Sequence, residues 1–136
     1  MREILFRGKD IAKNWHYGSL HIEHGETDCE GKQCLDYRIL GMRGECDYII
    51  PETVGQYTGL TDKNGKKIFE GDIVKIYLYE PKGLANYEIG CIKYDDTKAR
   101  FVFCTEEGNY GIDNSNVFEV IGNIHDNPEL MKGGEG

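Results

Sequence analysis

This sequence of 136 residues has few of the residues that mark several common protein classes. It contains 3 Pro and 1 Trp, and no apolar run approaches the roughly 20 residues that a membrane-spanning helix requires. The segment from Met1 to Arg7 lacks the extended apolar core of a secretory signal peptide. These absences exclude membrane-spanning and fibrous classes, and we expect a soluble, globular, cytoplasmic protein.

Basic residues are outnumbered, with 16 Lys and Arg against 24 Asp and Glu and a formal net charge of −8. Because an acidic chain repels phosphate, this balance disfavours binding to nucleic acid. The one dense basic cluster consists of Lys63, Lys66 and Lys67. It is too small to track a phosphate backbone and instead suits the tip of a hairpin.

The common catalytic motifs are also missing. The only two serines, Ser19 and Ser115, are not in G-x-S-x-G, no H-E-x-x-H is present, and no Gly-rich loop precedes a helix. The acidic pairs Asp95-Asp96 and Glu106-Glu107 are adjacent in sequence, so within a strand their side chains point to opposite faces. We therefore expect no enzyme, with no catalytic residue, no cofactor-binding residue and no cofactor.

The cysteine count is odd, which argues for free thiols in a reducing compartment. The five are Cys29, Cys34, Cys46, Cys91 and Cys104. Cys91 and Cys104 lie in alternating apolar runs, as residues of a core or of a sheet face do.

One cluster raises the question of zinc. It comprises His21, His24, Cys29, Cys34 and Cys46. Zinc sites usually contain a C-x2-C knuckle, whereas this chain has C-x4-C followed by a single Cys. The spacing favours a hairpin loop with free thiols and no metal ligand, and a small zinc-binding protein remains the alternative.

Short alternating runs separated by Gly, Asn and Asp dominate the chain and are typical of strands. The clearest runs are residues 35–40, 73–79, 87–94, 99–104 and 116–121. Only the sequence from Asn127 to Leu130 signals the start of a helix, and that helix is short. The pattern predicts a mainly β fold with minor short helices.

We expect two small β subdomains, because the pattern breaks at Pro51. Residues 1–50 form the N-terminal β subdomain, residues 51–132 form a C-terminal SH3-like β-barrel, and residues 133–136 form a flexible tail. Asn64-Gly65 predicts a type I′ hairpin turn, and Gly90 inside an alternating run suggests a bend or bulge.

Tyrosine is frequent for a chain of this length, with 9 copies. Four of them, Tyr77, Tyr79, Tyr87 and Tyr94, fall in predicted strands where a sheet face can display them. Such aromatic side chains build protein interfaces, and they also pack thin cores.

The central stretch from Pro51 to Val74, PETVGQYTGLTDKNGKKIFEGDIV, resembles the signature of the YopX family of small phage and prophage proteins. The opening residues 4–9 and the closing residues 120–124 and 127–130 are similar to that family too. The resemblance implies a mostly β fold with two subdomains and a homo-oligomer. It carries no catalytic residue over to this chain, and residues 23–44 match no family signature.

The residues and the resemblance together favour a phage- or prophage-encoded accessory protein that acts by binding protein in the cytoplasm of a bacterial host. Its expected partners are other copies of itself and a phage or host protein, without membrane or nucleic acid. An acidic inhibitor of a host nucleic-acid-binding protein is an alternative, and it requires Asp and Glu side chains in a regular row on one face.

The chain is expected to fold without zinc, because its candidate ligands lack the spacing of a closed site. Elemental analysis of the purified protein, followed by melting with and without a chelator, checks this. Stoichiometric zinc together with unfolding by the chelator would contradict it.

Overall fold

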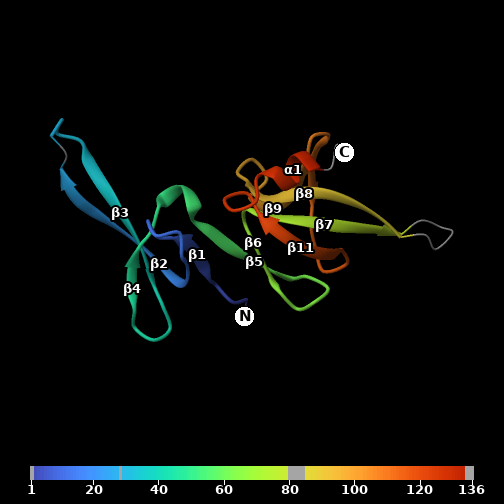
Figure 1. The fold of residues 1–136 in the computed structure, drawn as a ribbon, viewed down its shortest axis with the longest axis horizontal. Helices are drawn as coiled ribbons and strands as arrows, with labels where there is room; N and C mark the ends of the chain where they lie inside the picture. Colours follow the sequence, from blue (N-terminus) through green and yellow to red (C-terminus); the bar gives the residue numbers. More distant parts are fainter. Residues whose placement is uncertain (1, 28, 80–84, 134–136) are drawn as a thin grey trace. The chain divides into compact units, whose positions relative to one another are not determined.

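The computed structural model describes residues 2–27, 29–79 and 85–133, and these residues are mostly in strands (Figure 1). Contacts divide the chain into two compact units, Met1–Tyr57 and Thr58–Gly136. The predicted mainly β fold is confirmed. Among the described residues, no helix has the length and apolar character needed to cross a bilayer.

The first unit is an antiparallel sheet in the order β4-β3-β2-β1-β5. Its elements are β1 (Phe6–Lys9), β2 (Trp15–Thr27), β3 (Gln33–Leu40), β4 (Cys46–Tyr48), the 3-10 helix η1 (Pro51–Thr53) and the start of β5 (Gly55–Thr61). The strand β2 continues to Thr27, which pairs with Gln33.

The division between the units falls within β5. The backbone N–H of Lys9 donates to Thr53 Oγ1 at 2.8 Å, and Arg7 pairs with Gly55. These bonds attach η1 and the start of β5 to β1. The contacts therefore place residues 51–57 with the first unit, whereas the sequence pattern suggested a boundary at Pro51.

The first unit has a small core with one buried cation. Its buried apolar side chains include Ile39, Ile49 and Tyr57. Arg7 is only 5% exposed, and its guanidinium lies 4.6 Å from the centre of the Trp15 ring. A cation over an aromatic face regains part of the free energy that the charge loses on leaving water.

The second unit contains a five-stranded antiparallel sheet in the order β10-β9-β8-β7-β11. Its elements after β5 are β6 (Lys67–Phe69), β7 (Asp72–Tyr79), β8 (Ala85–Asp95), β9 (Arg100–Thr105), β10 (Gly108–Gly111), β11 (Val117–Asn123) and α1 (Glu129–Gly133). In the described residues this sheet is open, so the predicted SH3-like barrel is not confirmed. Gly133 ends α1, and the rest of the predicted tail lies outside the described residues.

The alternation within these strands explains the core of the second unit. One face of the sheet carries the side chains of the main buried cluster, and the hairpin of β5 and β6 adds Ile68 and Leu60 to them. The buried cluster consists of Ile68, Val74, Ile76, Ile92, Phe103 and Phe118. Burying a side chain of this kind contributes roughly 1.5–3 kcal/mol, so the hairpin is an integral part of the fold.

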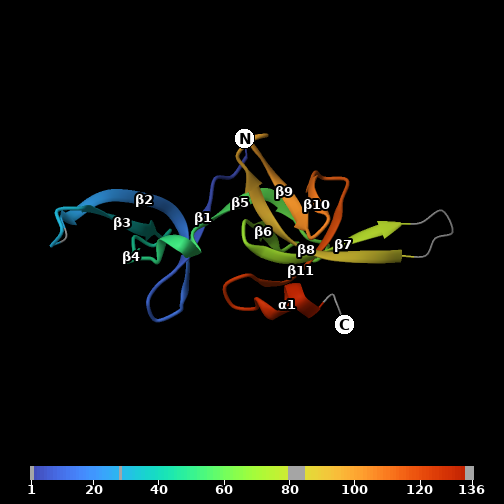
Figure 2. The same cartoon turned by 90° about the horizontal axis from the view of Figure 1, so that it is seen from above.

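The helix α1 lies beside β8 and β11 in the second unit (Figure 2). A Cβ atom at Gly122 would come within 2.8 Å of Leu130 Cδ1 and within 2.7 Å of Asn127 Oδ1. The loop before the helix therefore packs closely on β11, because a glycine in a strand leaves room for another segment to approach its backbone. The helix start predicted at Asn127 is confirmed, since α1 begins at Glu129.

The predicted bulge at Gly90 is wrong. Strand β8 pairs with β7 and β9 without a register shift at this residue, and the irregularity lies in β11 between Val120 and Gly122. A Cβ atom at Gly90 would lie 2.5 Å from the Cys104 carbonyl oxygen and 2.8 Å from the Phe103 ring. Any larger side chain at position 90 would clash with these neighbours, so the packing requires glycine there.

A buried carboxylate ties the hairpin to the sheet. Asp62 is 7% exposed, and its Oδ1 accepts the backbone N–H groups of Asn64 and Lys66, each at 2.9 Å. Its Oδ2 accepts the N–H of Val120 at 3.0 Å. The backbone N–H of Lys63 also donates to the carbonyl of Phe118 at 2.8 Å. One turn is thereby bonded to β11.

These hydrogen bonds determine the charge state of Asp62. Burial by itself would raise the pKa of this carboxyl, but the N–H groups of Val120, Lys66 and Asn64 outweigh burial and lower the pKa. The folded protein thus holds Asp62 as the carboxylate.

The hairpin turn is not type I′. Gly65 has a φ of +81°, whereas Asn64 is not among the residues with positive φ, and type I′ requires both. The N–H of Gly65 donates to the carbonyl of Asp62 at 3.0 Å. This is the pattern of a type I turn followed by a left-handed residue.

Gly65→Val is expected to destabilise the protein by about 1–3 kcal/mol, because a β-branched residue is strained at positive φ. No atom lies within 4 Å of the Cβ position at Gly65, so strain is the only cause. Thermal melting measures the loss. Gly65→Asn is the matched control and should lose much less, since Asn tolerates this conformation. Equal melting temperatures for both variants and the natural protein would contradict the turn assignment.

Asp62→Ala is expected to cost about 3 kcal/mol, because it leaves buried N–H groups without an acceptor. A folded-state pKa below the unfolded value stabilises the protein above pH 4 or so, and this contribution is lost as the pH falls through the lower pKa. The stability difference between the natural protein and Asp62→Ala should therefore shrink in acid. Denaturant unfolding at several pH values measures it.

Asp95→Ala is the matched control. Asp95 also accepts a backbone N–H in a turn, from Thr97 at 3.0 Å, but this hydrogen bond is exposed to solvent. A loss as large as that of Asp62→Ala would show that burial of the Asp62 carboxylate is not what matters.

Candidate functional site

The face of the second-unit sheet that carries Tyr77 and Tyr87 presents a group of aromatic and charged side chains. Strand register places Tyr77 opposite both Tyr87 on β8 and Val117 on β11, and it places Lys75 opposite Glu119. Paired residues in an antiparallel sheet share a face. We call Lys63, Lys75, Tyr77, Tyr87 and Glu119 the tyrosine–lysine face.

Two lysines lie over the two tyrosine rings. The Tyr77 and Tyr87 ring centres are 6.1 Å apart with the planes tilted by 58°. Lys63 Nζ lies 4.8 Å from the Tyr77 ring centre, and Lys75 Nζ lies 4.5 Å from that of Tyr87. Each ammonium group lies over the face of its ring within cation–π distance.

Polar contacts fix the position of Tyr77. Its hydroxyl donates to Glu119 Oε1 at 2.9 Å, and Lys63 Nζ lies 3.5 Å from the Tyr77 hydroxyl and 3.8 Å from Glu119 Oε2. The hydrogen bond to Tyr77, and then the charge of Glu119, raise the pKa of Lys63. The result is a positioned, charged and aromatic surface of the kind that protein interfaces contain.

The tyrosines of the predicted strands, which a sheet face can display, do not all lie on one face of the sheet. Tyr94 pairs with Phe101, with ring centres 5.3 Å apart, on the face opposite Tyr87. The side chain of Tyr79 falls outside what the structure describes. Of those whose side chains are described, Tyr77 and Tyr87 belong to the tyrosine–lysine face.

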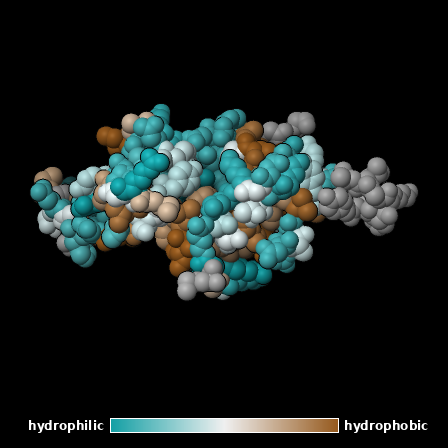
Figure 3. Space-filling view, turned by 90° about the horizontal axis from the view of Figure 1, so that it is seen from below, coloured by the Kyte–Doolittle hydropathy of each residue, from teal (hydrophilic) through white to brown (hydrophobic). Residues whose placement is uncertain are grey.

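The basic hairpin is divided in the same way. Lys63 turns onto the sheet, as described above, while Lys66 and Lys67 remain exposed in the hairpin. Scattered apolar side chains interrupt the hydrophilic surface elsewhere (Figure 3). The members of the tyrosine–lysine face contact one another through ring, cation–π and hydrogen-bond contacts.

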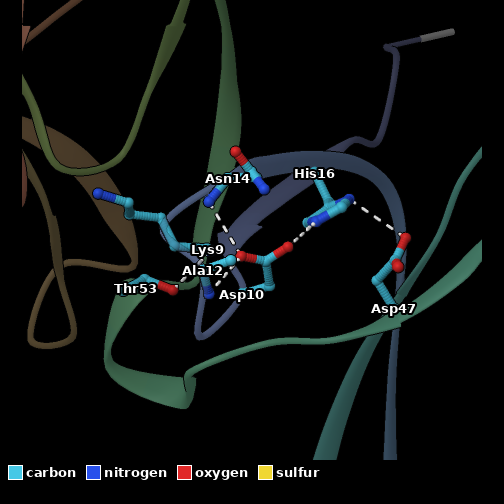
Figure 4. Close-up of polar contacts among 7 residues, drawn as sticks. All are labelled: Lys9, Asp10, Ala12, Asn14, His16, Asp47 and Thr53. Atoms are coloured by element: carbon cyan, nitrogen blue, oxygen red, sulfur yellow. Dashed lines mark hydrogen bonds and ion pairs between the residues drawn. The ribbon is translucent and has the colours of Figure 1, made fainter.

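A second polar cluster lies in the first unit, where Figure 4 shows His16 between Asp10 and Asp47. His16 Nε2 is 2.7 Å from Asp10 Oδ2, and Nδ1 is 3.2 Å from Asp47 Oδ2. The hydrogen bond from His16, and then the N–H of Asn14, lower the pKa of Asp10. The cluster connects the turn after β1 with β4.

The contacts of His16 give it a structural role, because they connect Asp10 with Asp47. Both ring nitrogens lie within hydrogen-bond distance of carboxylate oxygens that belong to other elements of the first unit. The Asp10 carboxylate also accepts the N–H groups of Ala12 and Asn14, each at 2.9 Å, and so shapes its own turn.

The residues considered for zinc are spread over the first unit. His21 and His24 lie in β2, opposite Arg38 and Leu35 respectively, so they belong to opposite faces. Cys29, Cys34 and Cys46 are all exposed. Within residues 2–27, 29–79 and 85–133, no group of three or more His, Cys, Asp or Glu side chains is arranged to hold a metal ion.

The acidic pairs lie at opposite ends of β9. Asp95 and Asp96 precede the turn into β9, and Glu106 and Glu107 follow its end at Thr105. A strand of six residues spans about 20 Å. These pairs therefore do not form a continuous row along one face.

Each unit also has a pocket on its surface. The one in the second unit has a volume of about 350 Å³ and is lined by residues that include Arg100, Phe101 and Asp113. The one in the first unit has a volume of about 540 Å³ and includes Cys34 and Tyr48. The carboxylate of Asp113 accepts a hydrogen bond from the backbone N–H of Ser115 at 2.8 Å.

Sequence reasoning missed three arrangements. The Asp62 carboxylate has a partner, Val120, that is distant in the chain. His16 lies between two carboxylates, and Cys91 stands opposite Cys104. For Asp62, the Asp-x-Asn-Gly pattern of a side-chain-capped turn was the available signal.

Comparison with known proteins supplies the family. The model of the YopX protein family matches residues 5–132. Among solved structures, the chain resembles protein EF1440 from Enterococcus faecalis, with 26% sequence identity and a TM-score of 0.54, over 96% of this chain and 99% of that one. No curated protein matches. On the strength of a match that spans nearly its whole length, this chain belongs to the YopX protein family.

Proposed function

We propose that this chain is a phage- or prophage-encoded accessory protein that works in the cytoplasm of its bacterial host by binding protein, first of all other copies of itself. The observation that carries the proposal is the tyrosine–lysine face. The family supports the phage origin, because the resemblance described above is to small phage and prophage proteins.

The composition of the face supports a binding role. Exposed tyrosines contribute strongly to protein interfaces because a rigid ring buries much area at a small entropic cost. The hydrogen bond to Glu119 holds Tyr77 in place before binding. The Tyr77 side chain therefore loses less conformational entropy on association. The flanking lysines supply the charged rim that interfaces commonly have.

The arrangement of the cluster around His16 supports a non-enzymatic role. Its imidazole lies between two carboxylates, and one of them, Asp10, also accepts the N–H groups of the turn that it stabilises. Of the alternatives, the acidic inhibitor requires a carboxylate row, which the acidic pairs around β9 do not supply. The zinc alternative has no assembled ligand set in the described residues.

Self-association is the expected behaviour, and Tyr87→Ala should weaken it by at least about tenfold, the effect of losing an interface tyrosine. Tyr110→Ala is the matched control, because Tyr110 and Tyr87 are each 47% exposed. Tyr110 pairs with Phe103 and therefore lies on the opposite face of the sheet. Sedimentation at several protein concentrations measures the oligomer, which we expect to be of defined size.

A single monomeric species that persists at high micromolar concentration would contradict self-association. Equal weakening by both substitutions would contradict the assignment of the face. The same two variants serve as baits for capture from lysogenic cells. A protein retained by Tyr110→Ala and lost by Tyr87→Ala would be a partner of this face.

A further inference from the structure

Two cysteines of the second unit stand directly opposite each other on neighbouring strands. Cys91 on β8 pairs with Cys104 on β9, and the register continues regularly through Ile92 and Phe103. Both thiols are free. Cys91 is 4% exposed, and Cys104 is partly exposed.

The backbone geometry of this pair suits a disulfide. Opposite residues of antiparallel strands have Cα atoms about 4.5 or 5.5 Å apart and side chains on the same face. A disulfide accommodates Cα separations of roughly 4.4–6.8 Å. Either kind of pair falls inside that range, so the bridge forms without movement of the strands.

The two thiols differ in access, which sets the order of reaction. Cys104 reaches the surface, and its Sγ lies 3.9 Å from the carbonyl oxygen of Thr105. Cys91 lies beneath it, and burial raises the pKa of the Cys91 thiol. A small oxidant therefore meets Cys104 first, and Cys91 is positioned to complete the exchange.

We infer that Cys104 and Cys91 form a dithiol site that takes a low-molecular-weight disulfide of the glutathione type and closes a cross-strand disulfide. The Cys104 thiolate attacks one sulfur of glutathione disulfide, whose S–S bond breaks. A mixed disulfide forms, and the leaving glutathione thiolate takes up the proton that Cys104 released.

In the second step Cys91 loses its proton and attacks the Cys104 sulfur. The mixed disulfide breaks, the cross-strand bond forms, and the second glutathione leaves as a thiol with that proton. The two protein thiols are oxidised, and one glutathione disulfide is reduced to two glutathione thiols. Excess thiol reverses both steps, as in a reducing compartment.

The bridge joins two strands that are already paired in the middle of the sheet. It restricts the unfolded chain by closing the loop between Cys91 and Cys104, and it leaves the folded sheet unchanged. It lies on the same face as Tyr77 and Tyr87, because Ile73 pairs with Cys91 on the strand that carries Tyr77. The inference does not depend on what that face binds.

The test uses the full chain with the three exposed cysteines replaced, as Cys29→Ser, Cys34→Ser and Cys46→Ser. The probe is glutathione disulfide added to the folded protein. We expect the intact mass to fall by two hydrogen atoms, and tryptic residues 83–93 and 101–132 to be recovered as one linked peptide. The melting temperature should rise by about 5 °C or more and return when dithiothreitol is added.

Two further variants separate the roles of the thiols. Adding Cys91→Ser should leave Cys104 as a stable glutathione adduct, while adding Cys104→Ser should sharply slow any adduct, because Cys91 is buried. Retention of both thiols in the folded background protein, or recovery of glutathione adducts without the linked peptide, would overturn the inference.

Discussion

The carboxylate of Asp62 is the contact on which the second unit depends. It accepts N–H groups from its own turn and from Val120, which lies on the last strand of the sheet. The hairpin of β5 and β6 supplies Leu60 and Ile68 to the core. The bond from Val120 to Asp62 and the bond from the Lys63 N–H to the Phe118 carbonyl fix the register of the hairpin on β11, which apolar contact alone does not specify. A short polar side chain therefore positions an apolar layer.

The same turn also builds the surface to which we assign function. Asp62 fixes the turn, and the next residue, Lys63, donates its backbone N–H to Phe118 and extends its side chain over Tyr77. The sheet has one face closed by the hairpin and another face on which α1 lies beside β8. The end of that second face away from α1 presents Tyr77 and Tyr87. Stability and the candidate interface thus share one turn.

Much of this fold could be predicted from the sequence. Alternation of apolar and polar residues located the strands of the second unit, and Asn127-Pro128 located the start of its helix. The division of the tyrosines was readable as well. Tyr94 follows Tyr87 by an odd number of positions, and in a regular strand this places them on opposite faces.

What escaped prediction depends on partners distant in the chain. The turn type at Gly65 follows from Asp62 capping the turn, and the burial of Asp62 follows from its bond to Val120. The pairing of Cys91 with Cys104 needs the register of β8 on β9, and the position of His16 needs Asp47 from β4. Sequence patterns define which residues alternate, but they do not define which residues of two strands stand opposite each other.

A titration of the Asp62 side-chain carboxyl by nuclear magnetic resonance tests the central claim most directly. The account predicts a midpoint below that of an exposed aspartate, with the amide signals of Asn64, Lys66 and Val120 changing at the same midpoint. A midpoint at or above the ordinary value, or a Val120 amide that does not respond, would contradict it.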